Sequence, residues 1–133
     1  MISEFYKNRD KHYVAVDCII MGFQENELNI MIAKRPFEPM KGGWSLMGGF
    51  VHEFASVNEA AKRVVNEFTG IDDIYMEQVG AYGEVERDLE RVISIAYYAL
   101  VDFEKFDTSI ARKYDARWVK FSRLPELIFD HTL

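Results

Sequence analysis

The sequence contains little cysteine and lacks any long run of apolar residues. Cys18 is the only cysteine among 133 residues, so no internal disulfide can form. This favours a reducing compartment, and we expect a cytoplasmic protein. No stretch of about 18 apolar residues is present, which argues against a membrane-spanning helix. Residues 1–12 also lack the apolar core of a signal peptide.

Positive charge is scarce as well. The 16 Lys and Arg residues are outnumbered by 22 Asp and Glu residues, and the formal net charge at pH 7 is −6. An acidic surface repels the phosphates of nucleic acids, and the sequence holds no run of about five basic residues that would offset this repulsion. The chain by itself is therefore a poor candidate for nucleic-acid binding.

The residues that are present predict a well-packed core. Hydrophobic residues make up 49% of the sequence and aromatic residues 14%, which is too apolar for a disordered chain. A length of 133 residues suits one domain, and neither a repeat nor an interior linker divides it. We expect a single domain over residues 1–133.

The hydrophobic pattern predicts a mixture of strands and helices. The first strand is nearly continuous in apolar residues, which is typical of a central strand buried on both faces. Gly48 and Gly49 are expected to interrupt regular structure. Strands and helices do not alternate regularly, so the pattern favours an α+β or layered sandwich fold. The expected strands are 13–23, 28–33, 44–47, 75–82, 92–101 and 118–121, with a helix at 108–114 and a helical turn at 123–129.

A helix over residues 57–69 is the clearest local prediction. Ser56 and Glu59 have the Ser-x-x-Glu spacing of a capping box, and Gly70 is a good helix stop. The apolar residues between them share one face at helical spacing, and they are Val57, Ala60, Ala61, Val64, Val65 and Phe68.

The segment from Gly48 to Ile71 resembles the Nudix box, whose family pattern is G-x5-E-x7-R-E-U-x-E-E-x-G-U, where U is a bulky aliphatic residue. With Gly49 as the first glycine, the positions that match are Arg63, Val65, Glu67, Gly70 and Ile71. The order of the expected strands around the box is also similar to the Nudix fold. The resemblance implies an α+β fold, an α/β/α sandwich around a mixed β-sheet.

Several box glutamates are replaced, at Ala55, Val64 and Phe68. In Nudix hydrolases the helical carboxylates hold Mg²⁺ or Mn²⁺, which polarises a diphosphate and helps to activate water. Only Glu67 remains of the three on the helix, and hydrocarbon side chains do not bind a divalent cation. The resemblance therefore implies no metal and no catalytic residue. Glu67 also has a structural interpretation, because an ion pair with Arg63 is possible at i, i+4 spacing.

An active enzyme stays open as the alternative. A metal-dependent, MutT-like pyrophosphohydrolase of nucleoside diphosphate derivatives such as ADP-ribose would use Mg²⁺ or Mn²⁺. Its metal ligands would be Glu67 together with Glu53, Glu84 or Glu86.

Nudix domains with altered boxes occur in a family of bacterial transcription regulators, where the domain senses a small ligand and a C-terminal winged helix binds DNA. Residues 44–51, 92–100 and 124–131 are similar to that family, and its sugar-responsive branch is the nearer one. The resemblance implies a non-catalytic sensor of a pentose or an ADP-ribose-like effector, with a homodimer as the expected assembly. DNA would be contacted only through a further domain, which we expect to follow Leu133.

The resemblance places a ligand on the sheet, beside the box loop. Asp17 interrupts an apolar strand, so it either braces a neighbouring backbone or accepts sugar hydroxyls. Arg35 could reach an anionic ligand, and Trp44 could stack on a sugar or a nucleobase, although a solvated strand end and a core position explain these two equally well. The other candidate ligand-binding residues are Gly48, Gly49, Phe50 and Arg87.

Overall fold

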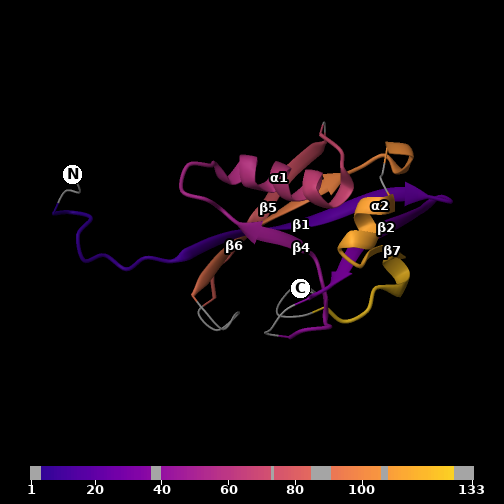
Figure 1. The fold of residues 1–133 in the computed structure, drawn as a ribbon. Coiled ribbons are helices and arrows are strands. Elements are labelled where there is room, and N and C mark those ends of the chain that lie inside the picture. The colour runs from indigo at the N-terminus through magenta and orange to yellow at the C-terminus, as the bar shows by residue number, and fades with distance from the viewer. Residues whose placement is uncertain (1–3, 37–39, 73, 85–90, 106–107, 128–133) are drawn as a thin grey trace.

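The computed structural model describes residues 4–36, 40–72, 74–84, 91–105 and 108–127 (Figure 1). Its centre is a seven-stranded mixed sheet in the order β3-β2-β1-β6-β5, with β4 paired to β1 and β7 paired to β2. The strands are β1 (Tyr13–Gln24), β2 (Glu27–Lys34), β3 (Trp44–Ser45), β4 (Met47–Phe50), β5 (Tyr75–Tyr82), β6 (Val92–Leu100) and β7 (Ala116–Lys120). The helices are α1 (Val57–Thr69) and α2 (Thr108–Lys113), with short 3₁₀ turns at Phe103–Lys105 and Phe121–Arg123. The expected mixed α+β sheet is confirmed.

Strand β1 organises the sheet, because three strands pair with it. It runs parallel to β6 along one edge. The other edge is shared: β4 pairs antiparallel with Ala15–Cys18, and β2 pairs antiparallel with Met21–Gln24. Strands β2 and β4 therefore separate from each other along β1, and this separation opens one side of the sheet.

Helix α1 forms as its sequence predicts. The Ser56 hydroxyl accepts a hydrogen bond from the Glu59 N–H at 3.1 Å, and Gly70 ends the helix with a left-handed φ of 75°. The helix lies along one face of the sheet, against β1 and β4 (Figure 1). Its buried residues are Ala60, Ala61, Val64, Val65 and Thr69.

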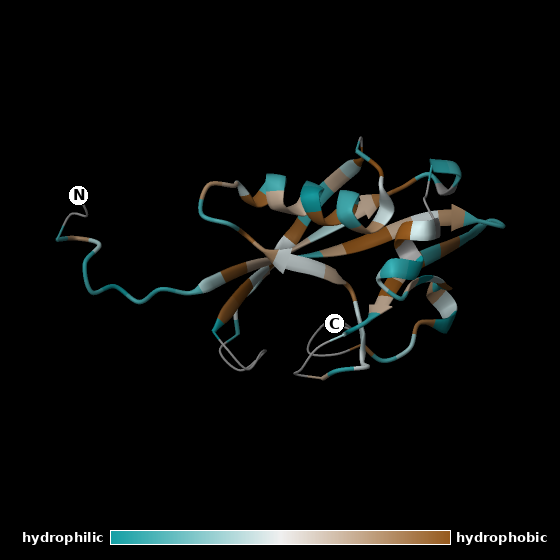
Figure 2. Ribbon diagram, viewed as in Figure 1, coloured by the Kyte–Doolittle hydropathy of each residue, from teal (hydrophilic) through white to brown (hydrophobic). Residues whose placement is uncertain are grey.

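Both faces of the central strand are packed, as expected. Val16, Cys18 and Ile20 of β1 belong to the cluster under α1, and the middle of β1 is strongly hydrophobic (Figure 2). On the other face, Ile19 and Met21 pack against a second cluster formed by Ile30, Ile32 and Leu127. Within the described residues, the C-terminal stretch rather than a long helix covers this second face.

None of the described helices has the length and apolar character needed to cross a membrane.

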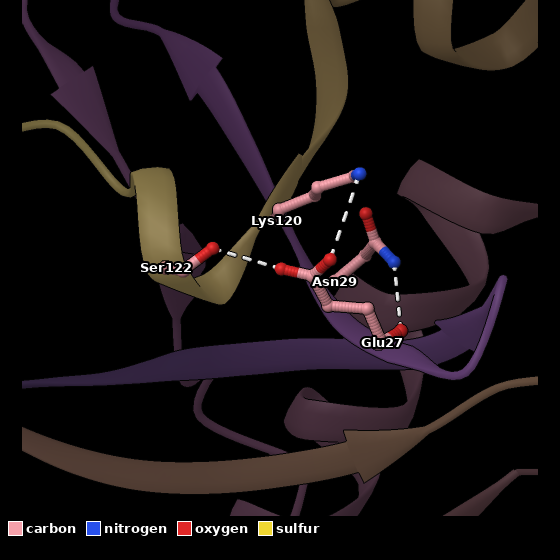
Figure 3. A network of polar contacts seen from close by, with 4 residues as sticks. All are labelled: Glu27, Asn29, Lys120 and Ser122. Atoms are coloured by element: carbon pink, nitrogen blue, oxygen red, sulfur yellow. Dashed lines mark hydrogen bonds and ion pairs between the residues drawn. The ribbon is translucent and has the colours of Figure 1, made fainter.

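A small polar network ties the turn between β1 and β2 to Lys120, at the end of β7, and to Ser122, in the 3₁₀ turn that follows (Figure 3). The Glu27 carboxylate accepts the Ser122 hydroxyl at 2.8 Å and lies 3.5 Å from Lys120 Nζ. The hydrogen bond from Ser122 and the charge of Lys120 lower the pKa of Glu27. Asn29 Nδ2 donates to the Glu27 carbonyl at 3.0 Å, which braces the same turn.

Three local predictions were wrong. Gly48 and Gly49 do not break regular structure; they lie within β4, where pairing with β1 supplies their backbone partners. Among the described residues, the C-terminal 3₁₀ turn comes earlier than the expected 123–129, at Phe121–Arg123, and residues 128–129 of the expected turn lie outside them. Leu124 is extended, with ψ of 125°, because the following Pro125 disfavours helical backbone there. The strand predicted at 44–47 is split at Leu46 into β3 and β4.

Candidate ligand-binding site

A cavity of about 700 Å³ lies where β2 and β4 separate. Strands β1, β2, β4 and β6 contribute to its wall, together with the end of α1 and the α2–β7 connection. Of the candidate residues from the sequence, the structure gathers these around the cavity: Asp17, Arg35, Gly48, Gly49, Phe50 and Glu67.

Asp17 has a side-chain partner on the neighbouring strand. The Ser94 hydroxyl, from β6, donates a hydrogen bond to Asp17 Oδ2. Ser94 is buried and also lines the cavity. Sequence reasoning missed Ser94, although it is the only small hydroxyl residue in an otherwise apolar strand. The half-buried carboxylate is thus held by a hydroxyl, which compensates for the water that it has lost.

Gly48 is required opposite Asp17. The two residues are register partners in the β1–β4 pair. A Cβ at Gly48 would lie 2.6 Å from Asp17 Oδ1 and 2.8 Å from the Val16 carbonyl oxygen. These are distances that real Cβ atoms do not adopt, so only glycine lets the carboxylate occupy this place.

Glu67 contacts the connection that follows α2. The Tyr114 hydroxyl donates to Glu67 Oε1 at 3.1 Å, and the Tyr114 ring lies 4.5 Å from the Phe68 ring, centroid to centroid. Burial raises the pKa of the Tyr114 hydroxyl, and the bonded Glu67 carboxylate raises it further. Tyr114 lines the cavity, and no local sequence signal pointed to it.

The predicted ion pair between Arg63 and Glu67 was wrong. Arg63 Nη2 donates instead to the Phe50 carbonyl at 2.8 Å, and among the described residues no ion pair joins it to Glu67. The guanidinium therefore braces the end of β4 against α1, which positions the cavity wall at Gly49 and Phe50.

Positive side chains line another part of the cavity. They are Lys34, Arg35, Lys41 and Lys113. The loop that carries Lys41 is closed onto the end of β2, because the Arg35 N–H donates to the Gly43 carbonyl at 2.9 Å and the Gly42 N–H donates to the Arg35 carbonyl at 2.8 Å. Gly42 has a φ of 84°, which suits glycine at this turn.

Three other candidates lie elsewhere. Trp44 does not line the cavity; it packs against the second cluster, with Arg117 Cζ 4.7 Å and Lys34 Nζ 5.3 Å from its ring centroid. Glu53 is exposed in the turn before α1, and Glu84 is exposed after β5; neither lines the cavity. Arg87 and Glu86 lie outside the described residues.

The residues present do not fit a divalent cation. In the described part of the chain, no three His, Cys, Asp or Glu side chains gather as a metal-binding group. Val64, at a box glutamate position, is 1% exposed and packs within the core. Phe68, at the other replaced glutamate position on the helix, packs against the ring of Tyr114. Glu67 is then the one carboxylate that the box helix offers to the cavity, so we derive no metal-dependent step.

The chain is similar in sequence to two known proteins of different activity. The chain is 32% identical over 123 residues to the ADPR responsive transcriptional repressor NtrR of Acinetobacter baylyi, covering 89% of this chain and 49% of that protein. It is 35% identical over 119 residues to the ADP-ribose pyrophosphatase of Methanocaldococcus jannaschii, covering 89% of this chain and 68% of that protein.

The fold is similar to that of Shewanella oneidensis NrtR. The TM-score is 0.80 at 27% identity, covering 90% of this chain and 58% of that one; the same regulator complexed with a 27mer DNA gives 0.79. The chain spans about half the length of the Acinetobacter repressor that it matches in sequence. Residues 11–132 match the NUDIX domain family, and the chain belongs to that family.

Proposed function

We propose that this chain is the ligand-sensing Nudix domain of a bacterial transcription regulator, and that it binds an ADP-ribose-like effector without hydrolysing it. In this proposal residues 1–133 form one Nudix domain, which acts in the cytoplasm as a homodimer. DNA contact would come through a further domain, and the structure of Shewanella NrtR complexed with a 27mer DNA supports this part of the proposal. Binding of the effector would change the relative stability of two conformations and so alter the affinity for DNA.

One observation carries the proposal: the box helix faces the cavity with a single carboxylate, where a hydrolytic site would need several oxygen ligands. A divalent cation that neutralises phosphate charge normally contributes several kcal/mol to transition-state stabilisation. With only one box carboxylate to hold that cation, the cavity should bind an anionic ligand without cleaving it.

The cavity chemistry favours a nucleotide-like effector over a free pentose. Its volume of about 700 Å³ is in the range of small-molecule and cofactor sites. Asp17 offers carboxylate oxygens to sugar hydroxyls, Phe50 offers an apolar ring, and Arg35 offers a positive charge. A free pentose would use only the Asp17 carboxylate, through its hydroxyl groups. The names of both curated relatives also refer to ADP-ribose.

Calorimetric titration tests the proposal, with ADP-ribose, AMP, ribose 5-phosphate and arabinose as ligands. We expect ADP-ribose to bind most tightly. Asp17→Asn should weaken binding by roughly 10-fold, because it removes a charged acceptor. Glu84→Gln is the matched control, since Glu84 is exposed and outside the cavity, and it should leave the affinity unchanged. The absence of heat with every ligand would refute the proposal.

An ADP-ribose pyrophosphatase is the second candidate, favoured by the 35% identity to the Methanocaldococcus enzyme. It predicts release of AMP when the protein is incubated with ADP-ribose and Mg²⁺ or Mn²⁺. Because Glu67 is the one box carboxylate in the cavity, Glu67→Gln should then abolish that release. The sensor proposal predicts that neither the unsubstituted protein nor Glu67→Gln releases AMP.

A further inference from the structure

The cavity gathers positive charge on an otherwise acidic chain. Lys34 ends β2, Arg35 and Lys41 lie in the loop that follows, and Lys113 ends α2; all four line the cavity. The chain as a whole has a net charge of −6. Four positive side chains therefore line one cavity of a chain that is negatively charged as a whole.

Backbone hydrogen bonds connect the segments that carry these four residues. The loop with Lys41 is closed onto Arg35 by its bonds to Gly42 and Gly43. The Lys34 N–H donates to the Asp115 carbonyl at 3.4 Å, which joins the end of β2 to the residues that follow Lys113. The three segments are thus fixed to one another at the end of β2.

The acidic side chains of the cavity already have partners. Asp17 accepts the Ser94 hydroxyl, Glu67 accepts the Tyr114 hydroxyl, and Asp115 lies 3.7 Å from Arg117 Nη2. Among the described residues, no ion pair involves Lys34, Lys41 or Lys113; Lys34 Nζ lies 5.3 Å from the Trp44 ring centroid and Lys113 Nζ lies 5.5 Å from the Tyr114 ring centroid. Their charges are therefore available to an anionic ligand.

We propose that Lys34, Arg35, Lys41 and Lys113 form a cationic collar that binds the diphosphate of the effector in place of a metal ion. This inference rests on the proposed function and adds to it the group that neutralises the ligand's charge. Lysine and arginine donate charge-assisted hydrogen bonds to phosphate oxygens and need no divalent cation to do so. Binding should then be as tight in a chelator as in Mg²⁺, and it should weaken as salt screens the exposed lysines.

The test measures binding of ADP-ribose and of inorganic pyrophosphate by calorimetry, each in EDTA and in Mg²⁺. The variants are Lys41→Ala, Lys113→Ala and the double variant, and Lys62→Ala is the control because this exposed lysine of α1 does not line the cavity. Each cavity variant should lower the affinity for both ligands roughly fivefold, while the control leaves it unchanged. Circular dichroism of each variant checks that the fold is retained.

The outcomes separate the collar from the effector. Binding of either ligand only in Mg²⁺, or equal binding by the lysine variants, overturns the collar while ADP-ribose sensing stands. Lysine-dependent binding of pyrophosphate without any binding of ADP-ribose supports the collar and refutes the proposed effector. If neither ligand binds in either buffer, both proposals are refuted.

Discussion

The Tyr114 hydroxyl donates a hydrogen bond to Glu67 at 3.1 Å, across 47 residues of sequence. Glu67 is the carboxylate that the box helix keeps, and Tyr114 belongs to the connection that leads from α2 into β7. The box carboxylate is thus used to hold a neighbouring segment. A ligand that fills this cavity would contact the end of α1 and the α2–β7 connection together, and β7 leads from there to the C-terminal stretch that covers the second face of the sheet.

This relationship predicts different costs for two substitutions of Tyr114. Tyr114→Phe removes the hydrogen bond but keeps the ring contact with Phe68, so the free energy of unfolding should fall by about 1 kcal/mol or less. Tyr114→Ala also removes the ring contact and should cost about 1 kcal/mol more. Urea denaturation measures both. Equal costs for the two variants would show that the ring contributes nothing.

Gly48→Ala should destabilise the protein by about 1–3 kcal/mol, because the new methyl group would overlap the Val16 carbonyl and the Asp17 carboxylate. Gly80→Ala is the control, since nothing lies within 4 Å of a Cβ at that position of β5. Thermal denaturation compares the two. A neutral Gly48→Ala variant would contradict the close approach of β4 to β1.

Local features of the sequence were sufficient to predict helix α1. Its capping box, its apolar stripe and its terminal glycine all lie within the helix or next to it, and the observed bounds are the predicted ones. The long strands were predicted for the same reason, since each carries its own pattern. The strand at Gly48 and Gly49 was not predicted, because it depends on pairing with β1, whose partner residues Asp17 and Val16 lie 31 and 33 residues earlier.

The site was predictable only in part. The resemblance to the Nudix box led to residues around the box loop, and several of these line the cavity. Ser94, Tyr114 and Lys113 reach the cavity through tertiary contacts of β6 and α2, so no spacing in the sequence marks them. Trp44 has the side chain expected of a ligand-stacking residue, but Arg117 and Lys34 lie against its ring, and Arg117 comes from β7.

Cys18 predicts a dependence of stability on alkaline pH. The thiol is fully buried, and burial followed by the nearby Asp17 charge raises its pKa from 9.0 to about 12. Above pH 9 the unfolded chain loses this proton while the folded protein keeps it, so the free energy of unfolding should decrease between pH 9 and 12. Urea denaturation across this range should give a smaller decrease for Cys18→Ala. Equal slopes would refute this role of the thiol.

Arg63→Ala should loosen the cavity wall, because the guanidinium bonds the Phe50 carbonyl at 2.8 Å. We expect the free energy of unfolding to fall by about 1 kcal/mol and ligand affinity to fall with it. Lys62→Ala, at the neighbouring exposed position, should change neither. Denaturation and calorimetric titration measure the two effects. An unchanged affinity with a lowered stability would show that the bracing does not reach the cavity.

Phe68→Glu tests whether missing oxygen ligands explain the absence of a metal site. Phe68 and Glu67 both line the cavity, so the substitution places a second carboxylate beside the first. Two adjacent carboxylates together with the phosphates of a ligand would supply the oxygen ligands that Mg²⁺ and Mn²⁺ prefer. We expect the variant to bind Mn²⁺ in the presence of ADP-ribose, measured by the loss of the free Mn²⁺ signal in electron paramagnetic resonance. Phe68→Gln is the control and should not bind Mn²⁺.

Both variants lose the ring contact with Tyr114, so they should be destabilised to a similar extent, and the comparison between them isolates the charge. Tight Mn²⁺ binding by the unsubstituted protein would contradict the interpretation, because its box helix presents only Glu67 to the cavity. Mn²⁺ binding by Phe68→Glu alone would show that the hydrocarbon at this position is what keeps the cation out. That result would place the difference between sensing and metal binding at a single residue of α1.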